Sequence, residues 1–343
     1  MIIRTIKEED LQDLIAYNIK TYIDREKIDE SFDYRFYKNP FSKDTVNESL
    51  VVYDGDNNII GQALMMPSKL GFEGKVYPIV WGMDFFVDKQ FRGLTGTLLL
   101  KKAIEVGNHF GVGLSDTALE LHLHFGEHIA GYLDKYFRLS SIRGFLKTPF
   151  NKKADRTRSY KFPEELKIKG GKFIRVHDPA EIASGDGYWN PDLVEFIRNE
   201  EFIKWRFFRN KDEYIVYKFH SSRGPDESMP VYFAVHPIVW RRLNCLILSD
   251  YRFSCRRKDM FEKILNAAAK LARKNKIAVT FTGCSLPQFG KTLKKNFYVR
   301  LGKKMVIITN FQHLKIDPEL QKDTILVTYA DSDIDFNFFS NQW

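Results

Sequence analysis

The stretch VDKQFRGLTGTLLLKKAI, residues 87–104, places a basic loop with two glycines directly before an apolar, helix-like run. We expect a strand to end at Val87 and a helix to begin near Gly96. The first amides of a helix lack partners within it and carry partial positive charge, and a glycine turn lets the backbone approach an anion. Arg92 adds a permanent cation. The loop therefore predicts a phosphate-binding site, with a plain turn before a helix as the alternative.

The bulk composition narrows the class of protein. A chain of 343 residues with 44% hydrophobic and 15% aromatic content fits two domains with real cores. The net charge of +9 comes from lysines and arginines spread along the chain, without one stripe or a nucleic-acid motif. No run is apolar enough to span a membrane, and the N-terminus is charged where a secretory signal is apolar. We therefore expect a cytoplasmic protein without a nucleic-acid partner.

The three cysteines argue against two further classes. Cys245, Cys255 and Cys284 are odd in number and lack the spacing of a metal site. A disulfide scaffold and a zinc module are both disfavoured.

The two halves of the sequence echo one another. FDYRFYKNP (32–40) aligns with IKWRFFRNK (203–211), and IIRTIKEED (2–10) aligns with FIRVHDPAE (173–181), both at a shift of 171 residues. Two matches at one register, close to half the chain length, predict a tandem duplication. The polar, basic segment 150–172 is the expected seam, which predicts domains over 1–150 and 151–343.

The residue pattern of the first half predicts an order of strands and helices. We predict a strand over Ile2–Ile6, a helix over Leu11–Tyr22 and a hairpin at DGDNN (54–58), followed by the strand-like run KVYPIVWGMDFFV (75–87) and a helix over Gly96–Val106. Strands first, then alternating helix and strand, predict an α/β or α+β half with a mixed central sheet.

A family resemblance attaches to the loop. DFFVDKQFRGLTGTLLLKKAI resembles the acetyl-CoA motif of the GNAT N-acetyltransferases, in which a strand ending in valine precedes an Arg/Gln-x-x-Gly-x-Gly/Ala loop and an LL helix. Arg92 matches the basic position, whereas Thr95 and Thr97 stand where a glycine and a small residue are expected. The resemblance implies that these residues bind acetyl-CoA: Phe86, Val87, Arg92, Gly93, Leu94, Thr95, Gly96 and Thr97.

Other segments extend the resemblance over most of the chain. SDTALELHLHFGE (115–127) is similar to the family's N-x-x-A-x-x-x-Tyr-x-x-x-Gly-Phe segment, and YRFYKNPF, WRFFRN and VTYADSDID resemble segments of larger, tandem members. This implies two tandem GNAT-like acyl-CoA N-acyltransferase domains, each with a mixed, mostly antiparallel sheet flanked by helices. In SDYRFSCRRKDMFEKIL (249–265) the glycines are missing, although Arg256 and Arg257 remain. We therefore expect one acetyl-CoA site, in the first half, and a degenerate second half with a structural or acceptor-binding role.

The resemblance also implies direct attack of an amine on the thioester, with oxyanion donors from the backbone near Phe86 and Val87. We predict Asp84 as the general base, because it lies in an apolar strand where burial would raise its pKa. A solvated Asp on an alternating strand is the alternative, and Glu120 is the reserve candidate.

His122 is the predicted general acid, at the position of the family's tyrosine. An imidazole can protonate a thiolate near neutral pH. A packing role for His122 and an acid role for Tyr132 remain as alternatives. His122, His124 and His128 do not share one helix face, so we expect no metal. Trp81 is expected in the core or in an acceptor pocket.

The sequence thus predicts an acetyl-CoA-dependent N-acetyltransferase acting on a small amine, with amino sugars or nucleotide-linked amino sugars as acceptor candidates. A Fem-type transferase using charged tRNA and a non-catalytic acyl-CoA-binding module are the alternatives.

Overall fold

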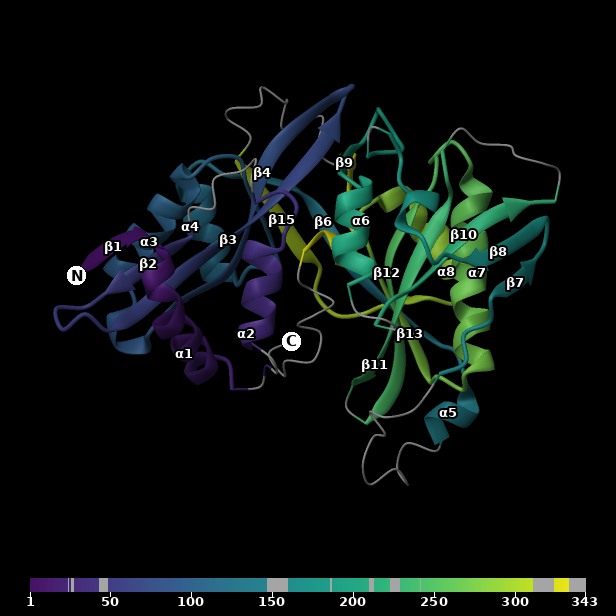
Figure 1. The fold of residues 1–343 in the computed structure, drawn as a ribbon, viewed down its shortest axis with the longest axis horizontal. Helices are drawn as coiled ribbons and strands as arrows, with labels where there is room; N and C mark the ends of the chain where they lie inside the picture. The colour runs from purple at the N-terminus through teal and green to yellow at the C-terminus, as the bar shows by residue number, and fades with distance from the viewer. Residues whose placement is uncertain are drawn as a thin grey trace. The chain divides into compact units, whose positions relative to one another are not determined.

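The computed structural model describes residues 1–23, 25, 28–42, 49–146, 160–185, 187–209, 213–222, 229–240, 242–310 and 324–332. The chain divides into two compact units (Figure 1). Unit 1 contains Met1–Tyr132 and the strand that begins at Met305; unit 2 contains Leu133–Lys304 and the segment that begins at Ile325. The predicted seam lies partly outside the described residues.

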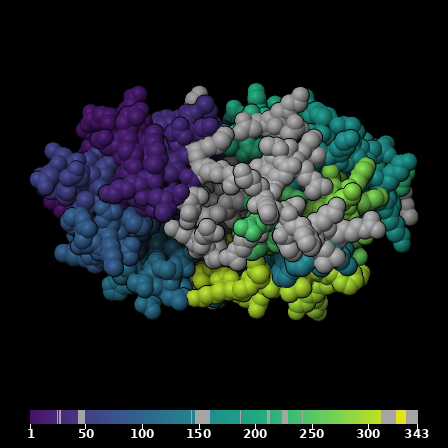
Figure 2. Space-filling view, turned by 90° about the horizontal axis from the view of Figure 1, so that it is seen from below, coloured from purple at the N-terminus to yellow at the C-terminus, as the bar shows by residue number. Residues whose placement is uncertain are grey.

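Unit 1 is built around one sheet. Its strands are β1 (Ile2–Thr5), β2 (Leu50–Tyr53), β3 (Ile59–Phe72), β4 (Lys75–Val87), β5 (His109–Val112) and β15 (Met305–Asn310). Its helical segments are η1 (Glu8–Asp10), α1 (Leu11–Thr21), α2 (Ile28–Phe32), the π-helical η2 (Asp33–Tyr37), η3 (Lys89–Phe91), α3 (Leu94–Glu105) and α4 (Asp116–His124). The N-terminal part of unit 1, from β1 to α4, has the purple-to-blue colours in the space-filling view (Figure 2).

The sheet of unit 1 runs β1-β2-β3-β4-β5-β15. Neighbours are antiparallel except for the parallel pair β4 and β5. The core lies between this sheet and α3, where Leu99 and Ala103 pack with buried side chains of β2, β3 and β4. Leu99 and Ala103 are four residues apart and share one helix face, which turns that face toward the sheet.

The predicted hairpin at DGDNN is confirmed. The carboxylate of Asp54 accepts hydrogen bonds from the amides of Asp56 (2.8 Å) and Asn58 (2.9 Å), and Asn57 takes a left-handed φ of 61°. Asp and Asn tolerate such turns because their short side chains bond to the local backbone. This turn joins β2 to β3.

Unit 2 has the larger set of elements. Its strands are β6 (His128–Leu139, paired in unit 2 from Asp134), β7 (Glu165–Ile168), β8 (Gly171–Arg175), β9 (Val194–Phe196), β10 (Ile215–Ser221), β11 (Tyr232–Trp240), β12 (Leu243–Arg252), β13 (Val279–Cys284), β14 (Val299–Arg300) and β16 (Ile325–Leu326). Its helical segments are α5 (Ile142–Leu146), η5 (Pro179–Glu181), α6 (Glu200–Phe207), α7 (Lys258–Lys274), η6 (Pro287–Phe289), α8 (Gly290–Lys295) and η7 (Tyr329–Asp331).

Among the described residues, the sheet of unit 2 runs β7-β8-β10-β11-β12-β13-β6, and β12 and β13 are the parallel neighbours in this order. Outside this order, the short strands β9 and β16 form a further parallel pair. The helix α7 covers this sheet with an apolar face. Its buried residues recur at helical spacing: Met260, Phe261, Ile264, Leu265, Ala268, Leu271 and Ala272. Both units therefore confirm the predicted mixed, mostly antiparallel sheet flanked by helices.

Each sheet takes its last strand from the other part of the sequence. In unit 1 the late strand β15 pairs antiparallel with β5, and in unit 2 the early strand β6 pairs antiparallel with β13. For this reason the division by contacts differs from a single boundary near residue 150. Among the described helices, none is long and apolar enough to cross a membrane.

Candidate active site

A bulge interrupts β4 where the strand faces the loop of residues 88–97. Gln62 pairs with Phe86 and Leu64 pairs with Met83, so two residues of β4 are unmatched between these pairs. Asp84 takes a φ of +48° at this point. The Gln62 side-chain amide donates to the Asp84 carbonyl over 3.1 Å, which helps to hold the bulge. A bulge frees backbone amides from the ladder, and those amides are then available to another acceptor.

The carboxylate of Asp84 is directed away from solvent into an ion-pair cluster. Nη1 of Arg25 lies 2.6 Å from Oδ1 of Asp84, and Nη1 of Arg35 lies 3.1 Å from Oδ2. Only 3% of the Asp84 side chain is exposed. Burial acts to raise the pKa of Asp84, but the two guanidinium groups outweigh it, and the pKa is lowered. The expected rise in this pKa is therefore wrong, because two arginines from earlier segments meet the carboxylate. Asp84 is poorly suited to act as a general base.

The strands β4 and β5 separate after a short parallel contact. Only Val80 with His109 and Trp81 with Phe110 are in register. Beyond them lies a cavity of about 1030 Å³, lined by Gly82–Val87 of β4 and by residues 111–115 at and after β5, with parts of α3 and α4. At the paired end of the two strands, the rings of Trp81 and Phe110 pack edge to face, with their centroids 4.7 Å apart. Trp81 is 1% exposed and thus belongs to the core.

The loop opens directly into this cavity. Gly93 has a φ of +89°, and α3 begins at Leu94, two residues earlier than expected. The amide of Thr97 donates to the Gly93 carbonyl over 2.9 Å, so the amides of residues 94–96 precede the first bonded turn. Nε of Arg92 donates to the Val87 carbonyl over 3.1 Å, which ties the exposed arginine to the end of β4.

Most of the predicted donor-binding residues line the cavity. They are Phe86, Val87, Arg92, Gly93, Gly96 and Thr97. Leu94 and Thr95 do not line it: Leu94 is 73% exposed, and the Thr95 hydroxyl lies 3.1 Å from the sulfur of Met1. The Thr97 hydroxyl donates to the Gly93 carbonyl over 3.0 Å, so it serves the helix start in this structure.

His122 lies in a buried cluster that the sequence did not predict. Nδ1 of His109 is 2.7 Å from Oε1 of Glu127, and Nδ1 of His122 is hydrogen-bonded to Oε2 of the same carboxylate. The two imidazoles are nearly parallel, at 12°, with centroids 5.7 Å apart. The side chain of Glu127 is 0% exposed, and both histidines line the cavity.

The protonation of this cluster follows from its contacts. Burial acts to raise the pKa of Glu127, but hydrogen bonds from His109 and His122 outweigh burial and lower it. An ionised carboxylate only accepts hydrogen bonds, so each Nδ1 carries a proton and each Nε2 is the nitrogen left to exchange protons. No described residue bonds to either Nε2.

Local backbone geometry brings these three residues together. Gly126 ends α4 with a φ of +86°, and the Glu127 amide donates to the His122 carbonyl over 3.1 Å. This turn folds Glu127 back onto the last turn of α4. On the other side, Gly82 leaves the space that Nε2 of His109 approaches. The motif HFGE gave a local signal for Glu127, whereas His109 is 18 residues away and carried none.

The cluster is also the group among the described residues with donor atoms close enough for a metal ion. The observed 2.7 Å between His109 and Glu127 is a hydrogen-bond distance. Two ligands of one tetrahedral zinc would stand roughly 3.3 Å apart. The spacing is therefore that of a hydrogen-bonded cluster. Of the other two histidines in this segment, His124 lines the cavity and is exposed, and His128 is exposed at the start of β6.

Two other candidates occupy less central positions. Glu120, the reserve base, is exposed at the cavity wall. Tyr132, the rival acid, is 43% exposed and does not line the cavity.

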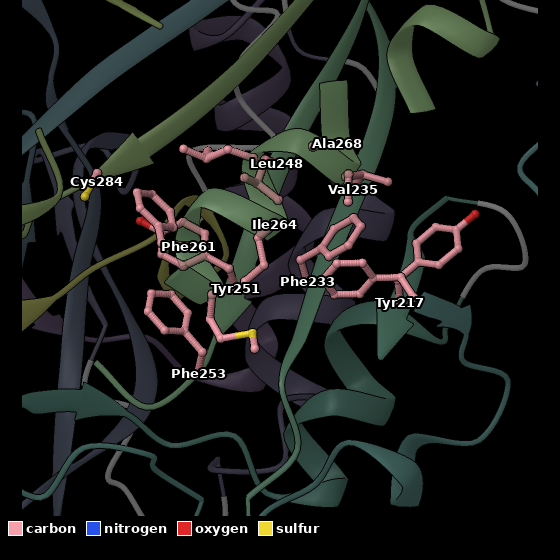
Figure 3. Packing of buried hydrophobic residues seen from close by; sticks show 14 of the residues in the cluster. Tyr217, Phe233, Val235, Leu248, Tyr251, Phe253, Phe261, Ile264, Ala268 and Cys284 are labelled. Atoms are coloured by element: carbon pink, nitrogen blue, oxygen red, sulfur yellow. The ribbon is translucent and has the colours of Figure 1, made fainter. Parts of the chain in front are cut away.

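The parallel neighbours β12 and β13 of unit 2 are paired over a longer stretch. β12 and β13 pair over four residues, from Cys245 with Val279 to Leu248 with Thr282. Beyond these pairs the Tyr251 hydroxyl donates to the carbonyl of Gly283 over 3.0 Å. Aromatic side chains fill the space around it, as Figure 3 shows for Tyr251, Phe253 and Phe261.

Comparisons with known proteins bear on the fold. Neither a family model nor a curated protein matches the sequence. Three solved structures resemble it over 90% of its length. A protein of unknown function from Enterococcus faecalis V583, described as a probable N-acyltransferase, has a TM-score of 0.56 at 13% identity over 71% of its own chain. A GCN5-related N-acetyltransferase from Anabaena variabilis has a TM-score of 0.56 at 11% identity over 72%.

The third is the N-myristoyltransferase of Saccharomyces cerevisiae with bound myristoyl-CoA, with a TM-score of 0.54 at 12% identity over 82% of that chain. The structural similarity to these three proteins extends over both units. Because the sequence identities are low, the similarity is evidence for the fold alone. The chain therefore has the fold shared by the GCN5-related N-acetyltransferases and N-myristoyltransferase.

Proposed function

We propose that unit 1 is an acyl-CoA-dependent N-acyltransferase that transfers an acetyl group to the amine of a small acceptor. One observation carries this proposal: the cleft between β4 and β5 runs from the β4 bulge to the first amides of α3. The similar N-myristoyltransferase was solved with myristoyl-CoA, which supports a CoA thioester as the donor.

The diphosphate of CoA would lie at the start of α3. The amides of residues 94–96 and the guanidinium of Arg92 supply donors and positive charge there. A charge at a helix start contributes about 0.3–1 kcal/mol on the surface and about 2 kcal/mol where it is partly buried. Several such contacts together would hold the diphosphate.

The pantetheine arm would occupy the cleft, with the thioester near the β4 bulge. Trp81 and Phe110 pack together where the two strands pair, and the two histidines bonded to Glu127 line the cavity. A long alkyl chain requires an apolar channel, since it would otherwise cover buried polar groups at a cost. This arrangement favours a short acyl group such as acetyl.

The transfer would be direct. The amine nitrogen attacks the thioester carbon, the C–N bond forms and the C–S bond breaks, while the nitrogen gives up one proton and the departing sulfur takes up one. Backbone amides near the bulge at Asp84 would stabilise the oxyanion, and His122 would protonate the departing thiolate through Nε2. Asp84 has no proton-transfer step in this scheme, because its lowered pKa and ion pairs assign it to holding the bulge.

We further infer that the chain is a tandem duplication with one donor site. Both sheets place one parallel pair between antiparallel neighbours, which supports the duplication. The four-residue pairing of β12 with β13 and the bond from Tyr251 to Gly283 support a closed second copy. The acceptor candidates remain amino sugars and nucleotide-linked amino sugars, on the sequence resemblance.

Calorimetric titration of the full chain with acetyl-CoA tests the proposal. We expect one saturable site per chain, with weaker binding in Arg92→Glu and unchanged binding in Lys75→Glu, which makes the same charge change at the exposed far end of β4. Absence of saturable binding in the wild-type chain would overturn the proposal. Binding without turnover on a panel of amines would instead favour a non-catalytic module, and salt-sensitive tRNA binding would favour a Fem-type donor.

A further inference from the structure

We propose that His109, Glu127 and His122 form a proton relay that holds one shared proton, in which His122 protonates the thiolate and His109 accepts the proton of the amine. This inference rests on the proposed function. It adds a catalytic role for His109 and a positioning role for Glu127, neither of which the sequence predicted.

The burial of Glu127 determines how many protons the cluster holds. The carboxylate is 0% exposed and bonds to one imidazole through each oxygen. With both imidazoles neutral, the cluster would carry an uncompensated negative charge, which is costly away from water. One imidazolium makes the cluster neutral, and a second would leave a buried positive charge. The cluster is therefore expected to hold one more proton than the two Nδ1 hydrogens, and this proton lies on Nε2 of one of the two rings.

The reaction leaves the number of protons on the cluster unchanged. Before attack, His122 is the imidazolium and His109 is neutral. As the C–N bond forms and the C–S bond breaks, the amine proton moves to Nε2 of His109 and the Nε2 proton of His122 moves to sulfur. The cluster remains neutral, and Glu127 keeps both hydrogen bonds throughout. Exchange with water in the open cavity then returns each ring to its first state.

The positions of the rings suit these roles. His122 comes from α4 and His109 from β5, on two elements that both border the cavity. Nδ1 of each ring is fixed by Glu127, which sets both tautomers. The approach of His109 Nε2 to Gly82 places that ring on the β4 side.

Other charged groups lie on the elements around the cavity. Asp84 from β4 is paired with Arg25 and Arg35. Further titratable or charged groups on these elements are Arg92 on the loop, Asp116, Glu120 and His124 on α4, and His128, Tyr132, Asp134 and Lys135 on β6. The lowered pKa of Glu127 owes to His109 and His122 and not to these groups.

The first test uses the free protein and does not depend on turnover. Nitrogen-15 NMR of histidine side chains reports which ring nitrogens carry protons. We expect the equivalent of one imidazolium shared by His109 and His122 near neutral pH, and its loss in Glu127→Gln, which keeps the size of the side chain. His128→Asn is the matched control, since it removes an exposed histidine next to the cluster. Two rings that titrate independently and do not respond to Glu127→Gln would overturn the relay.

The second test uses the pH profile of kcat. We expect the wild type to show a bell, His109→Asn to lose its acidic limb, His122→Asn to lose its basic limb, and each to lower kcat by about 10²–10⁴-fold. A role in packing alone would lower the amount of folded protein and leave both limbs in place. Zinc added to the free protein supplies a third outcome. Stoichiometric, tight binding that is abolished in Glu127→Gln would make the cluster a metal site and overturn the relay.

The two proposals fail separately. If acetyl-CoA binds and turns over while the histidines titrate independently, the relay is wrong and the acyltransferase stands. If the shared proton is found but no acyl-CoA binds, the proposed function is wrong, and the cluster has no thiolate to protonate.

Discussion

Gly82 and His109 are in such close contact that a β-carbon at position 82 would stand 2.1 Å from Nε2 of the imidazole. Real β-carbons do not approach other atoms to that distance, so one of the two must move when a side chain is added. Because Gly82 lies on β4 and His109 at the start of β5, this contact links the wall of the cleft to the buried cluster.

Gly82→Ala is therefore expected to displace His109 without changing any charge. We expect kcat to fall while the affinity for acetyl-CoA changes little, because the start of α3 is untouched. The steric conflict should also reduce stability by about 1–3 kcal/mol. Gly55→Ala, in the β2–β3 turn where no atom lies within 4 Å, is the control and should leave kcat unchanged. An unchanged kcat in folded Gly82→Ala would argue against a role for His109.

The substitution Asp84→Asn removes the negative charge of residue 84 and leaves its backbone geometry unchanged. Asparagine also tolerates the left-handed φ of 48°, so the bulge is not strained by the change. Arg25 and Arg35 would lose their shared carboxylate, and we expect a loss of about 3–5 kcal/mol in the free energy of unfolding at pH 7. Urea denaturation measures this, with the exposed Asp56→Asn as control.

The same pair of proteins has a predicted pH dependence. The pKa of Asp84 is lower in the folded protein than in the unfolded chain, so its contribution is complete above about pH 4 and is lost as the pH falls toward the folded pKa. The gap in stability between wild type and Asp84→Asn should thus narrow below pH 4. The acidic limb of kcat should be the same in both proteins. A limb that disappears in Asp84→Asn would restore Asp84 as the base.

A buried network of ion pairs in unit 2 leads to a similar prediction about the free energy of unfolding. Asp331 contacts Arg198 and lies 3.2 Å from Arg252, and all three side chains are 0% exposed. Asp331→Asn should lower the free energy of unfolding by about 3–5 kcal/mol, because two buried guanidinium groups would lose a counter-charge. Asp192→Asn breaks an exposed pair with Arg256 and should cost at most about 1 kcal/mol. Equal effects of the two changes in denaturation would show that the network does not stabilise unit 2.

The proposed single donor site is testable through two arginines of unit 2. Arg256 is 83% exposed, and Arg257 precedes α7 without a glycine turn. We expect Arg256→Glu combined with Arg257→Glu to leave acetyl-CoA affinity unchanged, in contrast to Arg92→Glu. A loss of binding in this double variant would place donor contacts in unit 2.

Much of the fold was accessible from sequence because its signals are local. The DGDNN turn, the helix from Leu11 and the order of strand, loop and helix around residues 87–104 each depend on neighbours within a few positions. The start of α3 was displaced by two residues, because Gly93 rather than Gly96 takes the left-handed backbone that precedes the helix. The exchange of β6 and β15 carried no local signal, since strand pairing across the chain depends on the whole sheet.

The chemistry of the site was less accessible for the same physical reason. The pKa of Asp84 is set by Arg25 and Arg35, which are 59 and 49 residues away. His122 could be selected from its place in α4, but its partner His109 comes from another strand. Long-range contacts determine the charge state of both groups, and a single sequence does not encode them as a pattern.

A crystal structure of the full chain with bound coenzyme A tests the central claim most directly. We predict that the diphosphate accepts hydrogen bonds from the amides of residues 94–96, that the pantetheine arm lies between β4 and β5, and that the sulfur faces Nε2 of His122. Coenzyme A bound between β12 and β13, or bound in unit 1 with its sulfur directed away from His122, would contradict the account.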